Sequence, residues 1–461
     1  MRVKLDIPLL ISEIIQATEG LAPKIDKNGL VRAITTDTRD MCPGDLFVAL
    51  PGKNFDGEEF CDLAIKSGCY CISVRHQKAI IVRNTEDALL DITAYYRKKL
   101  TSLKKVVAIT GSVGKTTTKE LLFTIMRSCA KVHATAGNYN NYIGLAHTVL
   151  TAPHDVEYLI AEIGMNHIGE IGKCSRAIKP DISVITRIGT AHIGCLGSRE
   201  MIAKAKLEIM EGMNENASLL IPCGEDLLVG SGRETVSIAE GNADFCLIPT
   251  ESSGGETAFI FRSYGKELFR GKASVIGEGN LRALSFSIAC AVKSGVDISE
   301  IKASISRISR DNFRQKYIRW QDRLIVDDSY NASLESVASS LELMRYFSGR
   351  RCAVLGDIHE LGSQTESIHF KVGAEAARLG VELLFLHGTH SPFIKKGATL
   401  SGLSDNAIFL NTDTTDLQST ITAIKLNTAP GDVILFKASH SCNFSALINE
   451  LISKEDKQSA G

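Results

Sequence analysis

A glycine-rich run around residue 112 has the composition of a phosphate-binding loop. An apolar β-branched stretch at 106–110 precedes two glycines, and Lys115 opens a helical pattern directly after them. The glycines allow a tight turn whose backbone N–H groups face an anion, and a helix starting at Lys115 directs the positive end of its dipole to the same point. Lysine reaches the β- and γ-phosphates in such loops, and the threonine after it binds Mg²⁺. The run therefore predicts an ATP and Mg²⁺ site made of Gly111, Ser112, Val113, Gly114, Lys115, Thr116 and Thr117.

An acidic and an imidazole side chain follow two later apolar runs. Glu162 ends the run that starts at Tyr158, and His192 lies in the segment after the run at 182–186. In open parallel sheets, ligands bind beyond the carboxyl ends of the strands, so both side chains should share a rim with Lys115. Carboxylate oxygens suit Mg²⁺, and imidazole binds metals or polarises phosphates. We therefore predict Thr116 and Glu162 as Mg²⁺ ligands, and His192 as either a metal ligand or a group that polarises a phosphate.

The stretch 199–210 carries charges in a helical pattern. Lys204, Lys206 and Glu208 recur among apolar residues as the polar face of an amphipathic helix does. The pattern alone predicts that all three side chains are solvated.

Recurring apolar runs predict an α/β protein of three domains. A chain of 461 residues exceeds what one core usually supports. We expect a small N-terminal α/β substrate module at 1–103, with a helix over 84–100. A central ATP-binding domain at 104–313 should have a mostly parallel sheet with strands near 106–110, 158–163, 182–186 and 219–221. A C-terminal Rossmann-like domain at 314–461 should repeat the pattern with strands near 324–326, 352–355, 382–386 and 433–436.

Composition excludes several kinds of partner. The net charge of −1 offers no electrostatic footprint for nucleic acid or an anionic membrane. No run of 18 apolar residues exists, and the twelve cysteines form no C-x-x-C pair. We expect a cytoplasmic monomer that acts on small molecules.

Several motifs together resemble the Mur ligase family, most closely its MurF type. They lie in order along nearly the whole chain. One of them is the glycine loop, which is shorter than the usual G-x-x-x-x-G-K-[ST] form: residue 109, where the first glycine would lie, is isoleucine, and the first glycine is Gly111. The motifs are Thr36–Arg39, Pro43–Leu50, Phe55–Gly57, Thr110–Thr117, Gly137–Gly144, Glu162–Glu170, Gly189–His192, Ala203–Ile209, Asp327–Ser333, Gly356–Gly362 and His369.

The resemblance implies ATP-dependent ligation through an acyl phosphate. It places one Mg²⁺ on Thr116 and Glu162 and a second near His192, and it implies that Lys206 is carbamylated by CO₂. Lys115, His192, Lys206 and Lys437 would be catalytic. The resemblance also implies nucleotide contacts for Asn280, Arg314 and Asp328, and substrate contacts for Thr38, Arg39, Asn138 and Asn141.

Four departures from the family pattern leave the substrate open. The run Gly277–Ala283 lacks the usual histidine and second asparagine, Phe313 replaces the hinge glycine, Leu334 replaces a common proline, and His440 replaces an arginine. One hypothesis is the joining of D-Ala-D-Ala to a UDP-N-acetylmuramoyl peptide. A second is a diverged paralogue acting in pseudomurein assembly or in ring closure of the methanogen nickel-tetrapyrrole cofactor. A third is an ATP-binding protein without catalysis.

Overall fold

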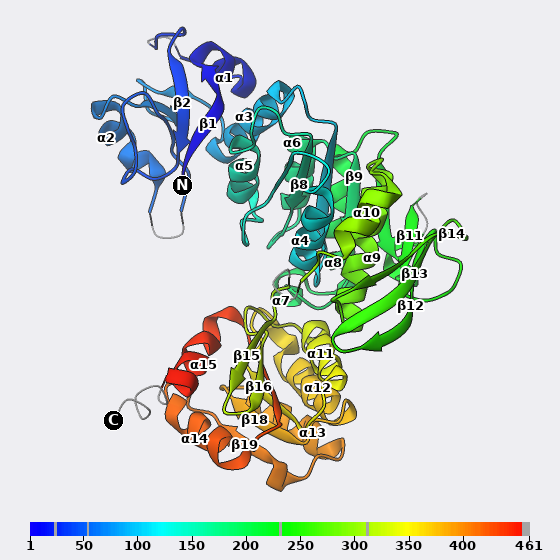
Figure 1. The fold of residues 1–461 in the computed structure, drawn as a ribbon. Helices are drawn as coiled ribbons and strands as arrows, with labels where there is room; N and C mark the ends of the chain where they lie inside the picture. The colour runs from blue at the N-terminus through cyan, green and yellow to red at the C-terminus, as the bar shows by residue number, and fades with distance from the viewer. Residues whose placement is uncertain (23–24, 53–54, 230–232, 310–312, 454–461) are drawn as a thin grey trace, which may run out of the picture.

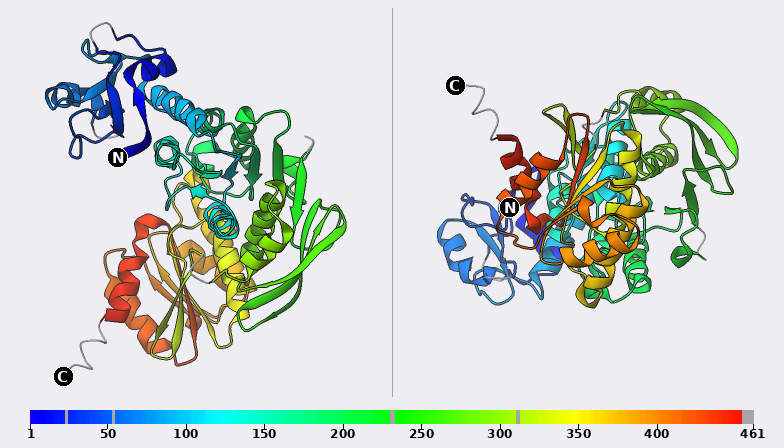
Figure 2. Two further views of the ribbon diagram at one scale, coloured as in Figure 1. Left: turned by 45° about the horizontal axis from the view of Figure 1, so that its top comes forward. Right: turned by 90° about the horizontal axis from the view of Figure 1, so that it is seen from below.

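Three sheets succeed one another along the chain. The computed structural model describes residues 1–22, 25–52, 55–229, 233–309 and 313–453. Figure 1 shows the N-terminal sheet at one end and the C-terminal sheet at the other, with the sheet whose strand at 105–110 leads into the glycine-rich loop between them. The views of Figure 2 show the first sheet standing apart while the other two parts lie against each other. The predicted α/β class with three domains is confirmed.

The N-terminal sheet has five strands, and only its first pair is antiparallel. In spatial order they are β1 (Arg2–Leu10), β2 (Leu30–Thr35), β3 (Leu46–Val48), β4 (Tyr70–Ser73) and β5 (Ile80–Ile81). Its helices are α1 (Ile11–Thr18), α2 (Cys61–Lys66) and α3 (Thr85–Lys99).

Helix α3 confirms the helix predicted over 84–100. The Asn84 side chain accepts a hydrogen bond from the Asp87 N–H at 2.9 Å, and basic residues occupy the last turn, where they complement the helix dipole. The helix packs against α1 on one side and against two helices of the central part, α5 (Tyr142–Leu150) and α6 (Glu170–Ile178), on the other. It therefore joins the first part to the second.

The central sheet has nine strands. The seventh in sequence pairs parallel with the sixth, and the first six all run parallel to one another. They are β6 (Lys105–Thr110), β7 (Val132–Ala134), β8 (Tyr158–Glu162), β9 (Ile182–Ile185), β10 (Ser218–Pro222) and β11 (Glu234–Ser237), in the spatial order β11-β10-β9-β6-β8-β7. The four strands predicted from apolar runs are β6, β8, β9 and β10.

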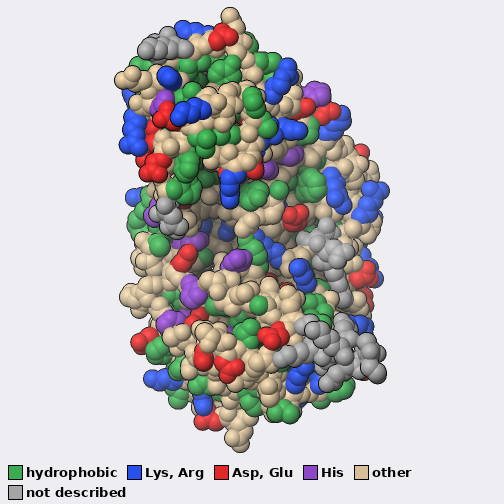
Figure 3. All heavy atoms as spheres, turned by 90° about the vertical axis from the view of Figure 1, so that its left-hand side faces the viewer, with side chains coloured by type: hydrophobic (Ala, Val, Ile, Leu, Met, Phe, Trp, Pro, Cys, Tyr) green, Lys and Arg blue, Asp and Glu red, His purple; other side chains and the backbone are tan. Residues whose placement is uncertain are grey.

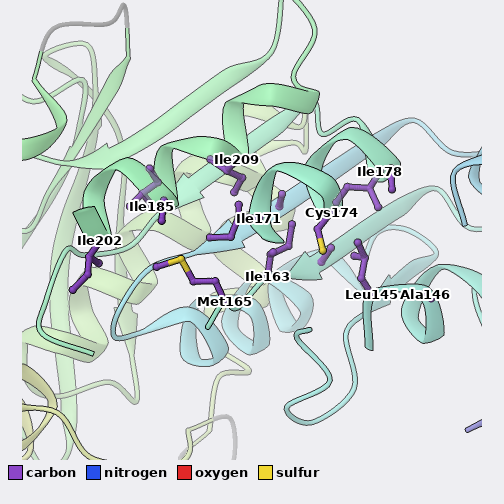
Figure 4. Close-up of a cluster of buried hydrophobic side chains, with 14 of the residues drawn as sticks. Leu145, Ala146, Ile163, Met165, Ile171, Cys174, Ile178, Ile185, Ile202 and Ile209 are labelled. Carbon is purple, nitrogen blue, oxygen red and sulfur yellow. The ribbon is translucent and has the colours of Figure 1, made fainter. Parts of the chain in front are cut away.

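Helices cover both faces of this sheet. On one face lie α4 (Lys115–Met126), α9 (Glu278–Lys293) and α10 (Ile298–Ile305). On the other lie α5, α6 and α8 (Arg199–Leu207), with the short helix α7 (Ile193–Leu196) before α8. Figure 4 shows the apolar side chains of this second face, where Ile171 and Cys174 of α6 point toward Ile163 after β8. Burial of this layer holds the carboxyl ends of β6, β8 and β9 in register.

An antiparallel meander extends the central sheet, and the sequence analysis did not predict it. It consists of β12 (Phe245–Ser253), β13 (Glu256–Ser263) and β14 (Lys266–Ala273). Turns at Gly254–Gly255 and at Gly265 join the strands, and Thr257, Phe259 and Phe261 alternate inward. The glycine turns and this alternation are ordinary hairpin signals.

The C-terminal sheet has six strands. A hairpin of β15 (Lys316–Trp320) and β16 (Arg323–Asp327) is followed across the sheet by β20 (Val433–Lys437), β17 (Arg351–Gly356), β18 (Leu383–His387) and β19 (Ile408–Asn411), all parallel to β16. Helices α11 (Leu334–Leu343), α12 (Thr365–Arg378) and α13 (Ser391–Leu400) pack on one face, and α14 (Leu417–Asn427) and α15 (Phe444–Ser453) on the other. The four predicted strands are β16, β17, β18 and β20. None of the described helices has the length and apolar character needed to span a bilayer.

Candidate active site

The glycine-rich loop joins β6 to α4 in a conformation that requires glycine. Gly111 and Gly114 have φ of 143° and 91°, in the left-handed region that side chains disfavour. A Cβ on Gly111 would lie 1.9 Å from Thr186 Oγ1 after β9. The hydroxyl of Thr186 donates to the Val113 carbonyl at 2.6 Å, and the Gly189 N–H donates to Ser112 Oγ at 2.9 Å. The segment after β9 therefore braces the loop.

Lys115 lies at the first turn of α4 and folds back over the loop. Its ammonium donates to the Gly111 carbonyl at 2.7 Å. Burial lowers the pKa of Lys115; the Glu162 carboxylate opposes this shift, and the Arg314 guanidinium adds to it. Phosphate oxygens bound in the loop would accept charge-assisted hydrogen bonds from this ammonium, which are stronger than its bond to a neutral carbonyl.

Thr116 and Glu162, which we predict to share one metal ion, are in direct contact. The Thr116 hydroxyl donates to Glu162 Oε2 at 2.7 Å, and the Asn140 amide donates to Oε1 of the same carboxylate at 2.9 Å. The Thr135 hydroxyl accepts the Glu162 N–H at 3.0 Å. Glu162 is 1% exposed, so these contacts hold its carboxylate in a defined orientation. The roles of Asn140 and Thr135 were not predicted.

A fully buried lysine of α4 holds the loop that carries Asn140. The Lys119 ammonium donates to the Thr135 carbonyl at 2.6 Å and to the Gly137 carbonyl at 3.4 Å, and it lies 2.7 Å from a Glu120 carboxylate oxygen. Because Lys119 comes one helical turn after Thr116, one face of α4 contacts both Glu162 and this loop.

Replacing Lys119 with Met should lower the free energy of unfolding by about 1–3 kcal/mol, because the Thr135 carbonyl loses its buried donor. Urea denaturation measures this change. The matched control is Glu120→Gln, which breaks only the partly exposed ion pair and should cost about 0.5 kcal/mol or less. Equal losses in the two variants would contradict the assigned role.

Lys206 is buried, which corrects the expectation of a solvated side chain. It is 3% exposed, whereas Lys204 two residues earlier is exposed. Burial and the nearby Lys115 ammonium lower the pKa of Lys206 well below its ordinary value. Its ammonium has no hydrogen bond or ion pair with any described residue, so the charged form has no local compensation.

Glu208 is also buried, against the same expectation. Its carboxylate accepts the Gly169 N–H at 2.7 Å and the Gly172 N–H at 3.2 Å. These amides lie at the N-terminus of α6, where a carboxylate is stabilised by the helix dipole. Helical periodicity cannot reveal such a contact, because the partner lies in a different element.

His192 lies in the segment between β9 and α7 and takes a left-handed conformation, with φ of 65°. Its Nδ1 lies 2.7 Å from Glu360 Oε2 of the C-terminal domain. Burial lowers the pKa of His192, and the charges of Lys115 and Lys206 add to this effect while Glu360 opposes it. The neutral imidazole is therefore favoured, the form that binds metals.

One cavity of about 350 Å³ lies between the central and C-terminal domains, and Lys115, Thr116, Glu162, His192 and Lys206 all line it. Figure 3 shows a hollow across one face of the molecule, with Lys, Arg and His side chains along it. The predicted residues that line the cavity are Ser112, Val113, Gly114, Lys115, Thr116, Thr117, Asn138, Asn141, Glu162, His192, Lys206, Asn280, Arg314, Asp328 and Lys437.

Arg314 reaches the phosphate loop from the junction of the two domains. Its guanidinium donates to Thr116 Oγ1 at 2.6 Å and stacks on the Tyr330 ring, 3.9 Å from the ring centroid. Tyr330 was not predicted, because no sequence pattern links it to Arg314, and the cation–π contact exists only in the folded chain.

The altered run at 277–283 changes the wall beside the predicted adenine contact. Asn280 donates to the Gln315 side chain at 3.2 Å and to the Ile276 carbonyl at 3.1 Å. A Cβ on Gly279 would lie 2.5 Å from Ser339 Oγ of α11. Glycine at this position thus permits close approach of α9 and α11.

Lys437 is held by the segment after β16. Its ammonium contacts Asp328 Oδ2 at 2.7 Å, the Asp328 carbonyl at 3.1 Å and the Asn331 carbonyl at 2.9 Å. Ser340 also donates to Asp328 Oδ2. Three acceptors satisfy the three donors of an ammonium. In this arrangement Lys437 orients the segment carrying Asp328, and its predicted catalytic role stays a prediction.

Two predicted substrate residues lie outside the cavity. Thr38 and Arg39 follow β2 in the N-terminal module, where the exposed Arg39 guanidinium pairs with Asp37 at 2.5 Å. Asn141 lines the cavity, but its side chain also accepts the Gly144 N–H at 2.8 Å and begins α5. Their substrate roles stay predictions.

Three successive segments of the chain match the domains of one known family. Residues 30–99 match the catalytic domain of the Mur ligase family, residues 109–291 the Mur ligase middle domain, and residues 313–440 the Mur ligase glutamate ligase domain. The fold and the phosphate-binding site thus define an ATP-dependent ligase.

Similarity to individual proteins covers nearly the whole chain. The UDP-N-acetylmuramoyl-tripeptide–D-alanyl-D-alanine ligase of Bacillus subtilis is 32% identical, over 96% of this chain and 97% of that protein. A crystal structure of MurF from Acinetobacter baumannii aligns with a TM-score of 0.87 at 28% identity, over 98% of this chain and 100% of that one. MurF from Thermotoga maritima in complex with ADP aligns with a TM-score of 0.80 at 28% identity, over 92% of this chain and 98% of that one. The chain belongs to the Mur ligase family and is of the MurF type.

Proposed function

We propose that the protein joins D-alanyl-D-alanine to a UDP-N-acetylmuramoyl tripeptide in peptidoglycan precursor synthesis. The full-length similarity to a ligase named for this reaction carries the proposal. The cavity supports it, because the phosphate loop, Glu162, His192 and Lys206 face one space between two domains. Nothing in the described residues favours a tetrapyrrole or pseudomurein substrate, and the retained cations argue against loss of catalysis.

The reaction brings two negatively charged groups together, and their repulsion must be offset. A carboxylate oxygen of the acceptor attacks the γ-phosphorus, and the bond to the ADP oxygen breaks. The amine of the incoming dipeptide then attacks the acyl carbon, phosphate leaves, and the nitrogen loses a proton. Carboxylate and triphosphate repel each other, so cations must hold them in line. Lys115 and Arg314 supply two such cations beside the phosphate loop.

The donor set around Glu162 fits Mg²⁺. No group of three His, Cys, Asp or Glu side chains suited to a metal occurs among the described residues. Mg²⁺ does not need such a cage, since it keeps several waters and takes one or two carboxylates together with substrate phosphates. Thr116 and Glu162 would hold one ion and His192 a second. When bound, Mg²⁺ neutralises the developing phosphate charge.

Lys206 has the surroundings that a carbamate requires. Carbamylation needs a neutral amine, and burial beside Lys115 favours the neutral form. Reaction of the neutral amine with CO₂ forms an N–C bond, releases one proton and converts the uncharged side chain into an anion. That anion would face Lys115 and could support a second metal ion near His192.

The function is tested by incubating the purified protein with ATP, Mg²⁺ and UDP-N-acetylmuramoyl tripeptide, with and without D-alanyl-D-alanine. We expect phosphate release and the ligated product, detected by mass spectrometry, only when both substrates are present. ATP binding without phosphate release under either condition would contradict the proposal.

Arg39→Ala should raise the KM for the nucleotide-sugar peptide about tenfold, because one charge-assisted hydrogen bond to the acceptor is lost. The KM for ATP should not change, since Arg39 lies outside the cavity. Steady-state kinetics with each substrate varied in turn measures both values. The control is Arg32→Ala, which changes a second exposed arginine of the N-terminal module, located in β2. Equal effects of the two variants would contradict acceptor binding by Arg39.

A further inference from the structure

The segment 189–197, which carries His192, is in contact with the C-terminal domain at several points. It leaves β9 beside the phosphate loop and ends before α8, which carries Lys206. Its contacts come from the start of α11 and from residues 360–364 between β17 and α12. The position of a predicted catalytic histidine therefore depends on a different domain.

The side-chain contact joins two residues with unusual backbone conformations. His192 Nδ1 lies 2.7 Å from Glu360 Oε2, and the two residues have φ of 65° and 62°. A left-handed conformation is uncommon outside glycine, and such residues concentrate at functional sites where surrounding contacts enforce them. Here each of the two residues faces the other across the domain boundary.

The backbones approach closely next to this pair. The Gly194 N–H donates to the Glu360 carbonyl at 2.9 Å. A Cβ on Gly194 would lie 2.6 Å from that carbonyl oxygen and 2.6 Å from the Gly362 nitrogen. All of these obstructing atoms belong to the backbone of the C-terminal domain, so a side chain at 194 conflicts with docking of the domains rather than with the fold of its own domain.

A second set of contacts flanks the first. The Thr190 hydroxyl donates to Glu335 Oε2 at 3.0 Å, and a Cβ on Gly189 would lie 2.8 Å from the same carboxylate. Gln364 donates to the Gly197 carbonyl at 3.5 Å. Both ends of the segment therefore contact the C-terminal domain.

We propose that residues 360–364, docked on residues 192–197, form an interdomain latch in which Glu360 is a positioning residue for His192. Docking of the C-terminal domain orients the imidazole toward the cavity, so the site is complete only when the latch is closed. The inference rests on the proposed function only through its ATP chemistry and does not depend on the identity of the acceptor.

Gly194→Ala tests the latch, with Gly241→Ala as the matched control because a Cβ at Gly241 meets no atom within 4 Å. Hydrogen exchange is measured with a non-hydrolysable ATP analogue and Mg²⁺, without acceptor. We expect exchange at 193–197 to be about tenfold faster in Gly194→Ala than in the control, because the Gly194 amide loses its partner across the boundary. Protection of 111–117 by the nucleotide should persist.

Turnover provides the second measurement. Gly194→Ala should lower kcat about 10- to 100-fold through misplacement of His192, with the KM for ATP within about threefold of the control. Exchange and turnover equal to those of Gly241→Ala would overturn the latch. Lost nucleotide protection at 111–117 would also overturn it, since the substitution would then act on the nucleotide site itself.

Glu360→Gln separates the carboxylate from the backbone contact. This variant keeps the Gly194–Glu360 backbone hydrogen bond, so exchange at 193–197 should stay close to wild type while kcat falls about tenfold. If Glu360→Gln had the same kcat as the wild type, Glu360 would not be a positioning residue for His192. Because the exchange measurement uses no acceptor, a wrong substrate assignment leaves its result unchanged, and the two failures are distinguishable.

Discussion

Lys206→Ala is expected to lower kcat by about 10²- to 10³-fold, the usual cost of removing one preorganised electrostatic group from a reacting centre. The wild-type side chain is buried, lacks a hydrogen-bond partner among the described residues and has a lowered pKa. These properties suit the carbamate proposed at this position, because its formation requires a neutral amine. Phosphate release in the presence of both substrates measures the loss.

The control for this prediction is Lys204→Ala, which removes an exposed lysine from the same helix and should leave kcat unchanged. Carbon-13 NMR with labelled bicarbonate should show a carbamate signal in the wild type and in Lys204→Ala but not in Lys206→Ala. Because the amine must be neutral to react, the signal should grow as the pH rises through the lowered pKa. Full activity of Lys206→Ala would refute the carbamate.

Lys115→Ala should lower kcat by about 10³-fold, because the ammonium that reaches the β- and γ-phosphates is lost. Binding of ADP should weaken much less, since the backbone N–H groups of the loop remain. Calorimetric binding and phosphate release measure the two effects.

Lys105→Ala is a matched control at the opposite end of β6, where the half-exposed ammonium lies 3.6 Å from Asp181. It should leave both binding and kcat unchanged. If the kcat of Lys115→Ala were as high as that of this control, the proposed role of the loop in the mechanism would be wrong.

In the central and C-terminal sheets, local patterns predicted those parallel strands that are continuous apolar runs, and they missed β7, β11 and β19. Strands buried on both faces, such as β6 and β8, consist almost entirely of such residues and need no partner to be recognised. The meander β12–β14 was missed because half of each strand is solvated, so its apolar residues are interrupted. Period-two alternation around Phe259 and Phe261 was the available signal.

The site was predictable where consecutive residues supply all the functional groups, as in the loop at Lys115. It was not predictable where contacts cross between elements. Lys204 and Lys206 look alike in a helical pattern, and only the packing of α8 against the central sheet distinguishes them. Glu360, Tyr330 and Lys119 act through partners far away in the chain, which single-sequence patterns cannot identify.

Helix α3 has a consequence for the substrate. Its 15 residues span about 22 Å between the N-terminal module and the central domain. Its Asp87 pairs with Lys173 of α6, and its Lys99 pairs with Glu13 of α1, so both ends are tied down. If the N-terminal module holds the nucleotide-sugar, this rigid spacing determines how long the peptide must be for its carboxylate to reach Lys115. Selectivity for the tripeptide would then depend on the length of the peptide and very little on its side chains.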